Sequence, residues 1–283
     1  MKKKTKIKSG LRKRIIFIVL LLAMLSITIK IYFDTATFKI NREQFQSDKL
    51  EEGTELKVLQ ITDVHSRVFG KENGAVLEKV KELDADIIVL TGDLIDRKTE
   101  NLEPALQFAE ELVQLNPDTY FVTGNHEHGN PEKEAFLAGL ADRGVIILNN
   151  KNTQFEKDGQ LFNIVGVNDI STEHEDMSPA FADLDTDKYT ILLSHAPIVV
   201  QKYPDVDADI VLSGHTHGGQ VRLPFIGALV APDEGLLPEL QKGIYPLGDE
   251  RYLYIDSGLG TSALPIRFLN QGQISLITIQ SNL

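Results

Sequence analysis

Two histidines, His215 and His217, stand one residue apart in the segment Val-Leu-Ser-Gly-His-Thr-His-Gly-Gly-Gln, residues 211–220. They follow an apolar run that is typical of a buried strand. Residues i and i+2 of an extended chain point to the same side, so both imidazoles can converge at the strand's end. Glycines around the pair let the backbone leave the strand sharply. Imidazole binds transition metals, so the segment indicates either a metal site or a polar turn that happens to hold two histidines.

Residues of metal-ligand types follow four further apolar runs. In chain order they are Asp63 and His65; Asp93; Asn125 and His126; and His195. Each motif is weak alone, because a Gly-Asp pair, for example, is mostly a turn. Five such motifs in series, each after an apolar run, predict one shared site, and they hold five of the chain's seven histidines. The other two, His128 and His174, fall outside the pattern, and we expect them to be ordinary loop residues.

Strands and helices alternate from residue 56 onward. Strands are expected at 56–61, 86–90, 120–122, 145–148, 153–156, 161–167, 189–193, 210–212, 220–223, 252–255 and 274–279, and helices at 75–83, 102–115 and 135–143, with a short one closing at 181–184. Alternation predicts α/β layers, and the helix-poor second half predicts a second sheet packed on the first. Ligands of such folds lie outside the carboxyl ends of strands, where all the motifs fall.

The N-terminal region has the composition of a membrane anchor. Residues 15–29 are apolar except for two small hydroxyl residues, and the run continues to Phe33 across Lys30. A span over 15–33 is long enough for a bilayer if Lys30 reaches the interface. The basic residues before it predict a cytoplasmic N-terminus and an external body. Thr35-Ala36-Thr37 is a poor signal-peptidase site, which favours an uncleaved anchor.

Composition and charge exclude several classes of protein. The chain has 283 residues, of which 42% are apolar and 25% charged, which argues against disorder. It has no cysteine, which excludes disulfides, thiolate metal sites and cysteine nucleophiles. Residues 1–14 hold eight basic and no acidic residues, and the whole chain carries −12, so the remainder carries −20. An acidic body disfavours nucleic acid and suits metal cations.

The motif order Asp-x-His, Gly-Asp-x-x-Asp, Gly-Asn-His-Glu, His and Gly-His-x-His, from Asp63 to His217, resembles that of the calcineurin-like metallophosphoesterases. Three tail segments, 218–224, 258–262 and 264–268, resemble the narrower YkuE/YaeI-like phosphodiesterase branch. The resemblance implies an αββα sandwich of two sheets, preceded here by the transmembrane helix. We therefore divide the chain into a basic cytoplasmic segment (1–14), a transmembrane signal anchor (15–33), a linker or edge strand (34–55) and a catalytic domain (56–283).

The family's roles carry over residue by residue. One metal ion would be held by Asp63, His65 and His217, the other by Asn125, His195 and His215, and Asp93 would bridge both through its two carboxylate oxygens. Two divalent ions of manganese, zinc or iron would activate a hydroxide for in-line attack on phosphorus. His126 would stabilise the transition state or protonate the leaving oxygen, and Asp96 would orient it. Arg97 would contact the substrate phosphate, with Arg67 and Arg222 as looser candidates.

The implied function is that of a metal-dependent phosphoesterase, foremost a phosphodiesterase, acting on a phosphodiester or pyrophosphate bond. The anchor and the apolar stretch 223–232 suggest a lipid-linked or cell-envelope substrate, unless that stretch packs into the core. A UDP-diacylglucosamine-type pyrophosphohydrolase is an alternative. A non-catalytic metal-binding scaffold is another, although such members usually lack the histidine found here at His126. The expected partners are the substrate and the cell membrane, crossed once, with no nucleic acid.

Overall fold

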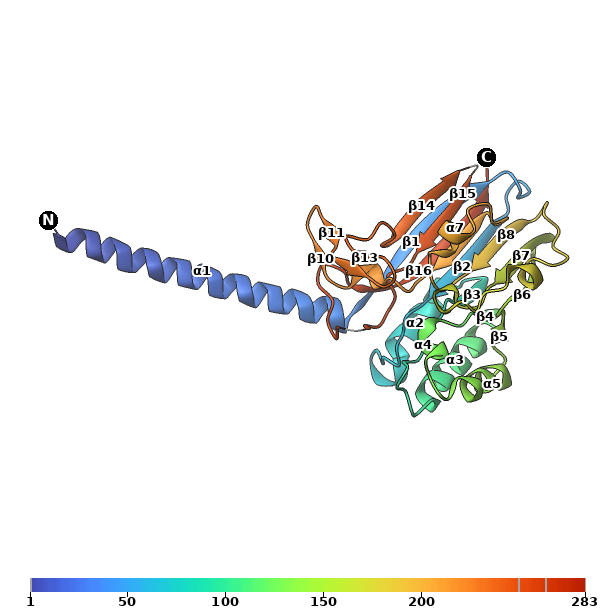
Figure 1. Cartoon of the computed structure of the whole chain (residues 1–283), viewed down its shortest axis with the longest axis horizontal. Coiled ribbons are helices and arrows are strands. Elements are labelled where there is room, and N and C mark those ends of the chain that lie inside the picture. The colour runs from blue at the N-terminus through green and yellow to red at the C-terminus, as the bar shows by residue number, and fades with distance from the viewer. Residues whose placement is uncertain (1, 249, 263, 283) are drawn as a thin grey trace.

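The computed structural model describes residues 2–248, 250–262 and 264–282. It begins with α1 (Lys2–Ala36). Within this helix, Gly10–Ala36 is long and apolar enough to cross a membrane, and it is the one such helix in the described part of the chain. Figure 1 shows α1 projecting from the body as a single rod. None of its most apolar window is buried against protein.

Two six-stranded sheets form the body. The first has the order β1 (Phe38–Ser47), β16 (Gly272–Ser281), β2 (Glu55–Ile61), β3 (Ile87–Leu90), β4 (Thr119–Phe121) and β5 (Ile146–Ile147). The second has the order β14 (Gly243–Gly248), β15 (Arg251–Ile255), β9 (Ile210–Ser213), β8 (Tyr189–Leu193), β7 (Gln160–Gly166) and β6 (Lys151–Lys157). Strands β2 to β5 are mutually parallel, as are β7, β8, β9 and β15. Their carboxyl ends therefore meet at one edge of each sheet.

Three apolar cores hold the layers together. One lies between the sheets, a second between the first sheet and its helices, and a third on the outer face of the second sheet. The alternation along β3 is clear, since Ile87 and Val89 face the other sheet while Ile88 and Leu90 face helices. The helices are α2 (Gly74–Leu83), α3 (Glu103–Leu115) and α5 (Lys133–Asp142) on the first sheet, with α6 (Met177–Ala180) and α7 (Val199–Lys202) on the second. The predicted two-sheet αββα sandwich is confirmed.

Two small hairpins follow the last motif, and the sequence patterns did not predict their pairing. They are β10 (Arg222–Leu223) with β11 (Gly227–Ala228), and β12 (Val230–Ala231) with β13 (Gly235–Leu236). Phe225 is fully exposed, and Ile226 and Val230 are more than half exposed. The stretch 223–232 therefore does not pack into the core, apart from its small residues Ala228 and Ala231.

Two other segments refine the expectations. Residues 38–47, within the segment expected as a linker or edge strand, form β1, which pairs in parallel with β16. The short helix expected to close at 181–184 instead ends at Ala180. Asp176 caps its first turn by accepting the N–H of Ser178 at 3.1 Å, which starts the helix earlier than apolar spacing suggested.

Candidate metal centre

The seven metal-ligand candidates converge at the carboxyl ends of five strands. Asp63 and His65 follow β2, Asp93 follows β3, Asn125 opens the short helix α4 (Asn125–His128) after β4, His195 follows β8, and His215 and His217 follow β9. All seven side chains are buried. Because both sheets contribute, the site lies where the ends of the two sheets face each other.

The backbone around these residues is unusual. Asp63, His65, Asp93, His215 and His217 all have positive φ, between 50° and 69°. Residues other than glycine rarely adopt this region. Hydrogen bonds between adjacent turns hold it in place: the N–H of Asp63 donates to the Gly92 carbonyl at 3.1 Å, and that of His65 to the Asp93 carbonyl at 3.0 Å. Such local strain clusters at functional sites, where the surrounding fold maintains it.

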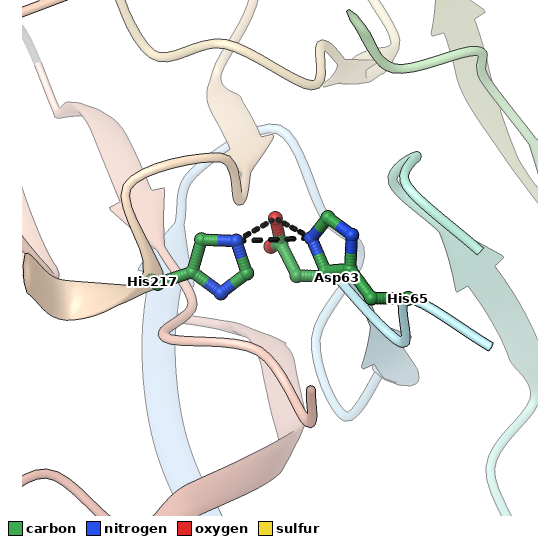
Figure 2. Close-up of side chains that lie close together, drawn as sticks. All are labelled: Asp63, His65 and His217. Carbon is green, nitrogen blue, oxygen red and sulfur yellow. Dashed lines mark hydrogen bonds and ion pairs between the residues drawn. The ribbon is translucent and has the colours of Figure 1, made fainter. Parts of the chain in front are cut away.

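Asp63, His65 and His217 form the first cluster (Figure 2). The Nε2 atoms of His65 and His217 lie 3.0 Å apart. Asp63 Oδ1 lies 3.4 Å from His217 Nε2 and 3.9 Å from His65 Nε2. Two imidazole nitrogens and one carboxylate oxygen therefore face a common point.

Asp93, Asn125, His195 and His215 form the second cluster. His195 Nε2 lies 3.2 Å from Asn125 Oδ1 and 3.1 Å from His215 Nδ1. Asp93 Oδ2 lies 3.2 Å from His195 Nε2 and 3.7 Å from His65 Nε2, so it faces both clusters. Its Oδ1 instead accepts the backbone N–H of His126 at 2.9 Å. Asp93 therefore presents Oδ2 to both clusters, while Oδ1 holds the backbone of the neighbouring turn.

In three of the histidines, the ring nitrogen that points away from the clusters forms a hydrogen bond. His65 Nδ1 lies 2.8 Å from Asp96 Oδ1, His195 Nδ1 lies 2.8 Å from the Thr91 carbonyl, and His215 Nε2 lies 2.7 Å from Asp233 Oδ2. Because each of these nitrogens donates to oxygen, the other nitrogen of each ring presents a lone pair to the site.

The donor set fits divalent transition-metal ions. In the second cluster, lone pairs of His195 and His215 face each other and the amide oxygen of Asn125. In the opposite orientation of the Asn125 amide, its nitrogen donates to both rings and to Asp93 Oδ2, whereas a bound cation would be held by its oxygen. Nitrogen and oxygen donors without thiolate suit manganese, iron and zinc. The residues present therefore fit two metal ions with Asp93 between them.

Charge inside the site favours anionic carboxylates. Burial would raise the pKa of Asp93, but the charge and hydrogen bond of His195 hold it well below the ordinary value. Burial would also raise the pKa of Asp96, yet its bonds to His126 and His65 keep it far below the usual range. Burial lowers the pKa of His217 well below that of free histidine. Burial would lower the pKa of His195, but the charge and hydrogen bond of Asp93 raise it well above the ordinary value, so His195 would release a proton when a metal ion binds.

Three further candidates border the clusters. His126 is half-buried next to Asn125, with its Nδ1 3.2 Å from Asp96 Oδ1. Its ring packs edge-on against that of His65, with centroids 4.5 Å apart. Arg97 is exposed at the rim, and its guanidinium touches the side-chain amide of Asn125. His126, Asp96 and Arg97 thus lie directly beside the residues of the two clusters.

The remaining candidates lie elsewhere. His128 and His174 stack on each other with centroids 4.0 Å apart, and His128 Nε2 bonds to Asn168 Oδ1 at 2.6 Å. Arg222 donates to the Gly218 carbonyl at 2.8 Å, and Arg67 donates to the Thr35 carbonyl at the end of α1. These contacts occupy both arginines with backbone oxygens.

Residues that support the ligands were missed by sequence reasoning. Glu127, Asp233 and Asn270 hydrogen-bond to the backbone or side chain of candidate ligands. Glu127 stands in the Gly-Asn-His-Glu motif, which could have drawn attention to it. Asp233 and Asn270 follow His215 and His217 at long distances in irregular loops, with no motif or periodicity to mark them.

Comparison with known proteins identifies the family. Residues 56–219 match the calcineurin-like phosphoesterase family. The Bacillus subtilis metallophosphoesterase YkuE is 31% identical over 230 residues, covering 80% of this chain and 79% of YkuE. YkoQ, also from Bacillus subtilis, is 29% identical over 86% of this chain and 90% of its own length. A Bos taurus transmembrane protein with a metallophosphoesterase domain is 28% identical, covering 80% of this chain and 53% of that protein. The chain therefore belongs to the calcineurin-like phosphoesterase family of metal-dependent phosphoester hydrolases.

Proposed function

We propose that the protein is a dinuclear metal phosphodiesterase that cleaves a phosphodiester or pyrophosphate bond in a lipid-linked or cell-envelope substrate. The observation that carries this proposal is the position of Asp93 Oδ2, which lies close to histidine nitrogens of both the first and the second cluster. The two clusters therefore form one site at the ends of both sheets. Bound divalent ions would lower the pKa of a water and neutralise charge on phosphoryl oxygens.

Different residues of the chain would hold the metal ions, protonate the leaving oxygen and bind the phosphoryl group. Asp63, His65 and His217 would hold one ion; Asn125, His195 and His215 would hold the other; and Asp93 would join them. His126 would donate a proton to the leaving oxygen, with its ring oriented by the carboxylate of Asp96 3.2 Å away. The exposed guanidinium of Arg97 would pair with the phosphoryl oxygens and fix the substrate's orientation.

An apolar cavity supports a lipid-linked substrate. It has a volume of about 510 Å³ and borders His217, and its walls include Leu229, Val230, Pro232 and Leu264. A hydrocarbon chain in this cavity would place an attached phosphate close to the first cluster. The cavity also favours a second candidate activity, the hydrolysis of the pyrophosphate bond of a lipid-linked nucleotide such as UDP-diacylglucosamine.

The location follows from α1 and its flanking charge. The apolar part of the helix would cross the cell membrane, and the basic residues of 1–14 would hold its start in the cytoplasm. The catalytic body would then face the external side, where lipid-linked envelope components are within reach.

The test uses the full chain in detergent, stripped of metal. Bis-p-nitrophenyl phosphate and p-nitrophenyl phosphate are each assayed with Mn²⁺, with Zn²⁺ and without added metal. We expect metal-dependent cleavage with a preference for the diester. Asp93→Asn should abolish it, while Asp142→Asn, an exposed carboxylate at the end of α5, should leave it unchanged. The opposite result is a protein that binds two metal ions and yet cleaves neither ester, nor a lipid-linked pyrophosphate supplied in vesicles. That result would instead support a non-catalytic scaffold.

A further inference from the structure

The anchor helix α1 is connected to the body by a very short linker. α1 ends at Ala36 and β1 begins at Phe38, so one residue separates them. The backbone N–H of Arg267 donates to Thr35 Oγ1 at 2.8 Å, and the N–H of Asn270 donates to the buried carboxylate of Asp34 at 3.3 Å. If α1 spans a bilayer as proposed above, the body cannot move away from that bilayer.

The segment that holds the helix end also carries exposed apolar side chains. Leu264 is 52% exposed. Phe268 forms a β-bridge with Val221, which directly precedes the β10–β11 hairpin. The hairpin therefore lies next to the segment that holds the end of α1. Figure 1 shows α1 projecting from the end of the body that carries β10, β11 and β13.

The two hairpins present their largest apolar side chains to solvent. Phe225 is fully exposed at the β10–β11 turn, and Leu236 and Leu237 of the second hairpin are 80% and 64% exposed. We call residues 223–237 together with Leu264 the anchor-side surface. A soluble face rarely gathers so many large apolar side chains without a partner.

The charge of these segments differs from that of the body. Although residues after 14 carry −20, residues 220–232 contain one arginine and no acidic residue. Residues 257–272 likewise contain one arginine, Arg267, and no acidic residue. The acidic residues of the anchor-side surface are Asp233, which bonds to His215, and Glu234, which accepts from Gln201, so the segments 223–232 and 257–272 meet anionic lipid headgroups without a carboxylate of their own.

We propose that the anchor-side surface inserts its apolar side chains into the leaflet from which α1 emerges, so that the lipid bilayer is its partner. The depth expected for such interfacial contacts is the boundary between headgroups and acyl chains. Asn270 bonds both Asp34 of the anchor and the carbonyl of His217, so this docking would hold the metal centre at the membrane surface. The inference rests on the anchoring part of the proposed function and not on the catalytic part.

A single tryptophan reports this contact cleanly, because the chain contains no tryptophan. The full chain carrying Phe225→Trp is reconstituted in phosphatidylcholine vesicles with or without brominated acyl chains. Bromine near the headgroups should quench its emission roughly twofold, since interfacial side chains sit within bromine's short range. Leu22→Trp, at the middle of the apolar run, should be quenched by deeply placed bromine. Leu115→Trp should not be quenched, because Leu115 is an exposed residue at the end of α3, a helix that lies away from the hairpins (Figure 1).

Each outcome separates the possibilities. Quenching of Leu22→Trp without quenching of Phe225→Trp would overturn the docking proposal and leave the anchor in place. No quenching at Leu22 would overturn the anchor and the docking together. Equal quenching of Leu115→Trp would show general adsorption of the body and also overturn a specific surface. Leu236→Trp, on the second hairpin, repeats the test if Phe225→Trp does not fold, and diester cleavage in detergent reports folding and catalysis independently of docking.

Discussion

The carboxylate of Glu127 accepts the backbone N–H of Asp93 at 2.9 Å, which fixes the turn that aims the Asp93 side chain into both clusters. The same carboxylate accepts the N–H groups of Gly124 at 2.9 Å and Ile95 at 3.2 Å. It is fully buried, and burial together with the charge of Asp93 raises its pKa to about 7. One side chain therefore ties the turn after β3 to the turn after β4.

Replacing Glu127 by alanine should destabilise the protein and disturb the site. Three buried N–H groups would lose their acceptor, at about 1–3 kcal/mol for each group left unsatisfied. Urea unfolding and metal content should both show the loss. Glu127→Gln is the matched control, because its amide oxygen can still accept from Asp93 and Gly124. Equal stability of the alanine variant and the natural protein would contradict this role.

Removing the carboxylate of Asp233 should weaken metal binding through His215. Asp233 lies 2.7 Å from His215 Nε2 and so holds the lone pair of Nδ1 toward the second cluster. Loss of such a partner typically lowers metal affinity by about 10- to 100-fold. Competition with a chelator would measure the change in Asp233→Ala. Glu234→Gln removes a neighbouring charge without touching His215, and an equal effect of both variants would reject the assignment.

The difference between Asp63 and Asp233 shows what a sequence can reveal. Asp63 follows a continuous apolar strand, and the carboxyl ends of parallel strands must meet, so the convergence of the seven ligand candidates could be predicted. Asp233 reaches His215 only because an irregular loop with two short hairpins folds back over the site. The pairing of β1 with β16 was equally invisible, since it joins residues more than two hundred positions apart and depends on the whole sheet being formed.

Replacing His126 by alanine should slow catalysis according to the leaving group. If His126 donates a proton to the leaving oxygen, a diester that releases an alkoxide should lose about 100-fold or more in kcat. Bis-p-nitrophenyl phosphate should lose less, because p-nitrophenolate leaves readily without a proton. Metal content should be retained, since Asn125 and not His126 faces the second cluster. A loss of equal size for both diesters would indicate that His126 acts on something other than the leaving group.

The stability of the metal-free protein should depend on pH through Asp256. This side chain is buried and accepts hydrogen bonds from Gly258 and Ser275, but burial dominates and raises its pKa to about 6. A raised carboxyl pKa means that the folded state prefers the protonated form. Its contribution is therefore full below the unfolded pKa near 3.8 and is lost as pH rises through about 6. Relative to Asp256→Asn, the natural protein should lose up to about 3 kcal/mol between pH 4 and pH 7. A constant difference across that range would exclude this titration.

Asn270 should couple the anchor to the first cluster. Its backbone N–H donates to Asp34 at 3.3 Å, and its side-chain amide donates to the carbonyl of His217 at 2.7 Å. Because His217 has a strained backbone with positive φ, loss of the amide should let its ring turn away from Asp63 and His65. Asn270→Ala should then weaken one of two metal-binding steps by about 10-fold or more, while the other, through His195 and His215, keeps its affinity. Gln271→Ala removes only a contact to Thr37 and should leave both steps unchanged in the same Zn²⁺ titration. If both steps weakened equally in Asn270→Ala, the amide would act on the whole domain and not on His217 alone.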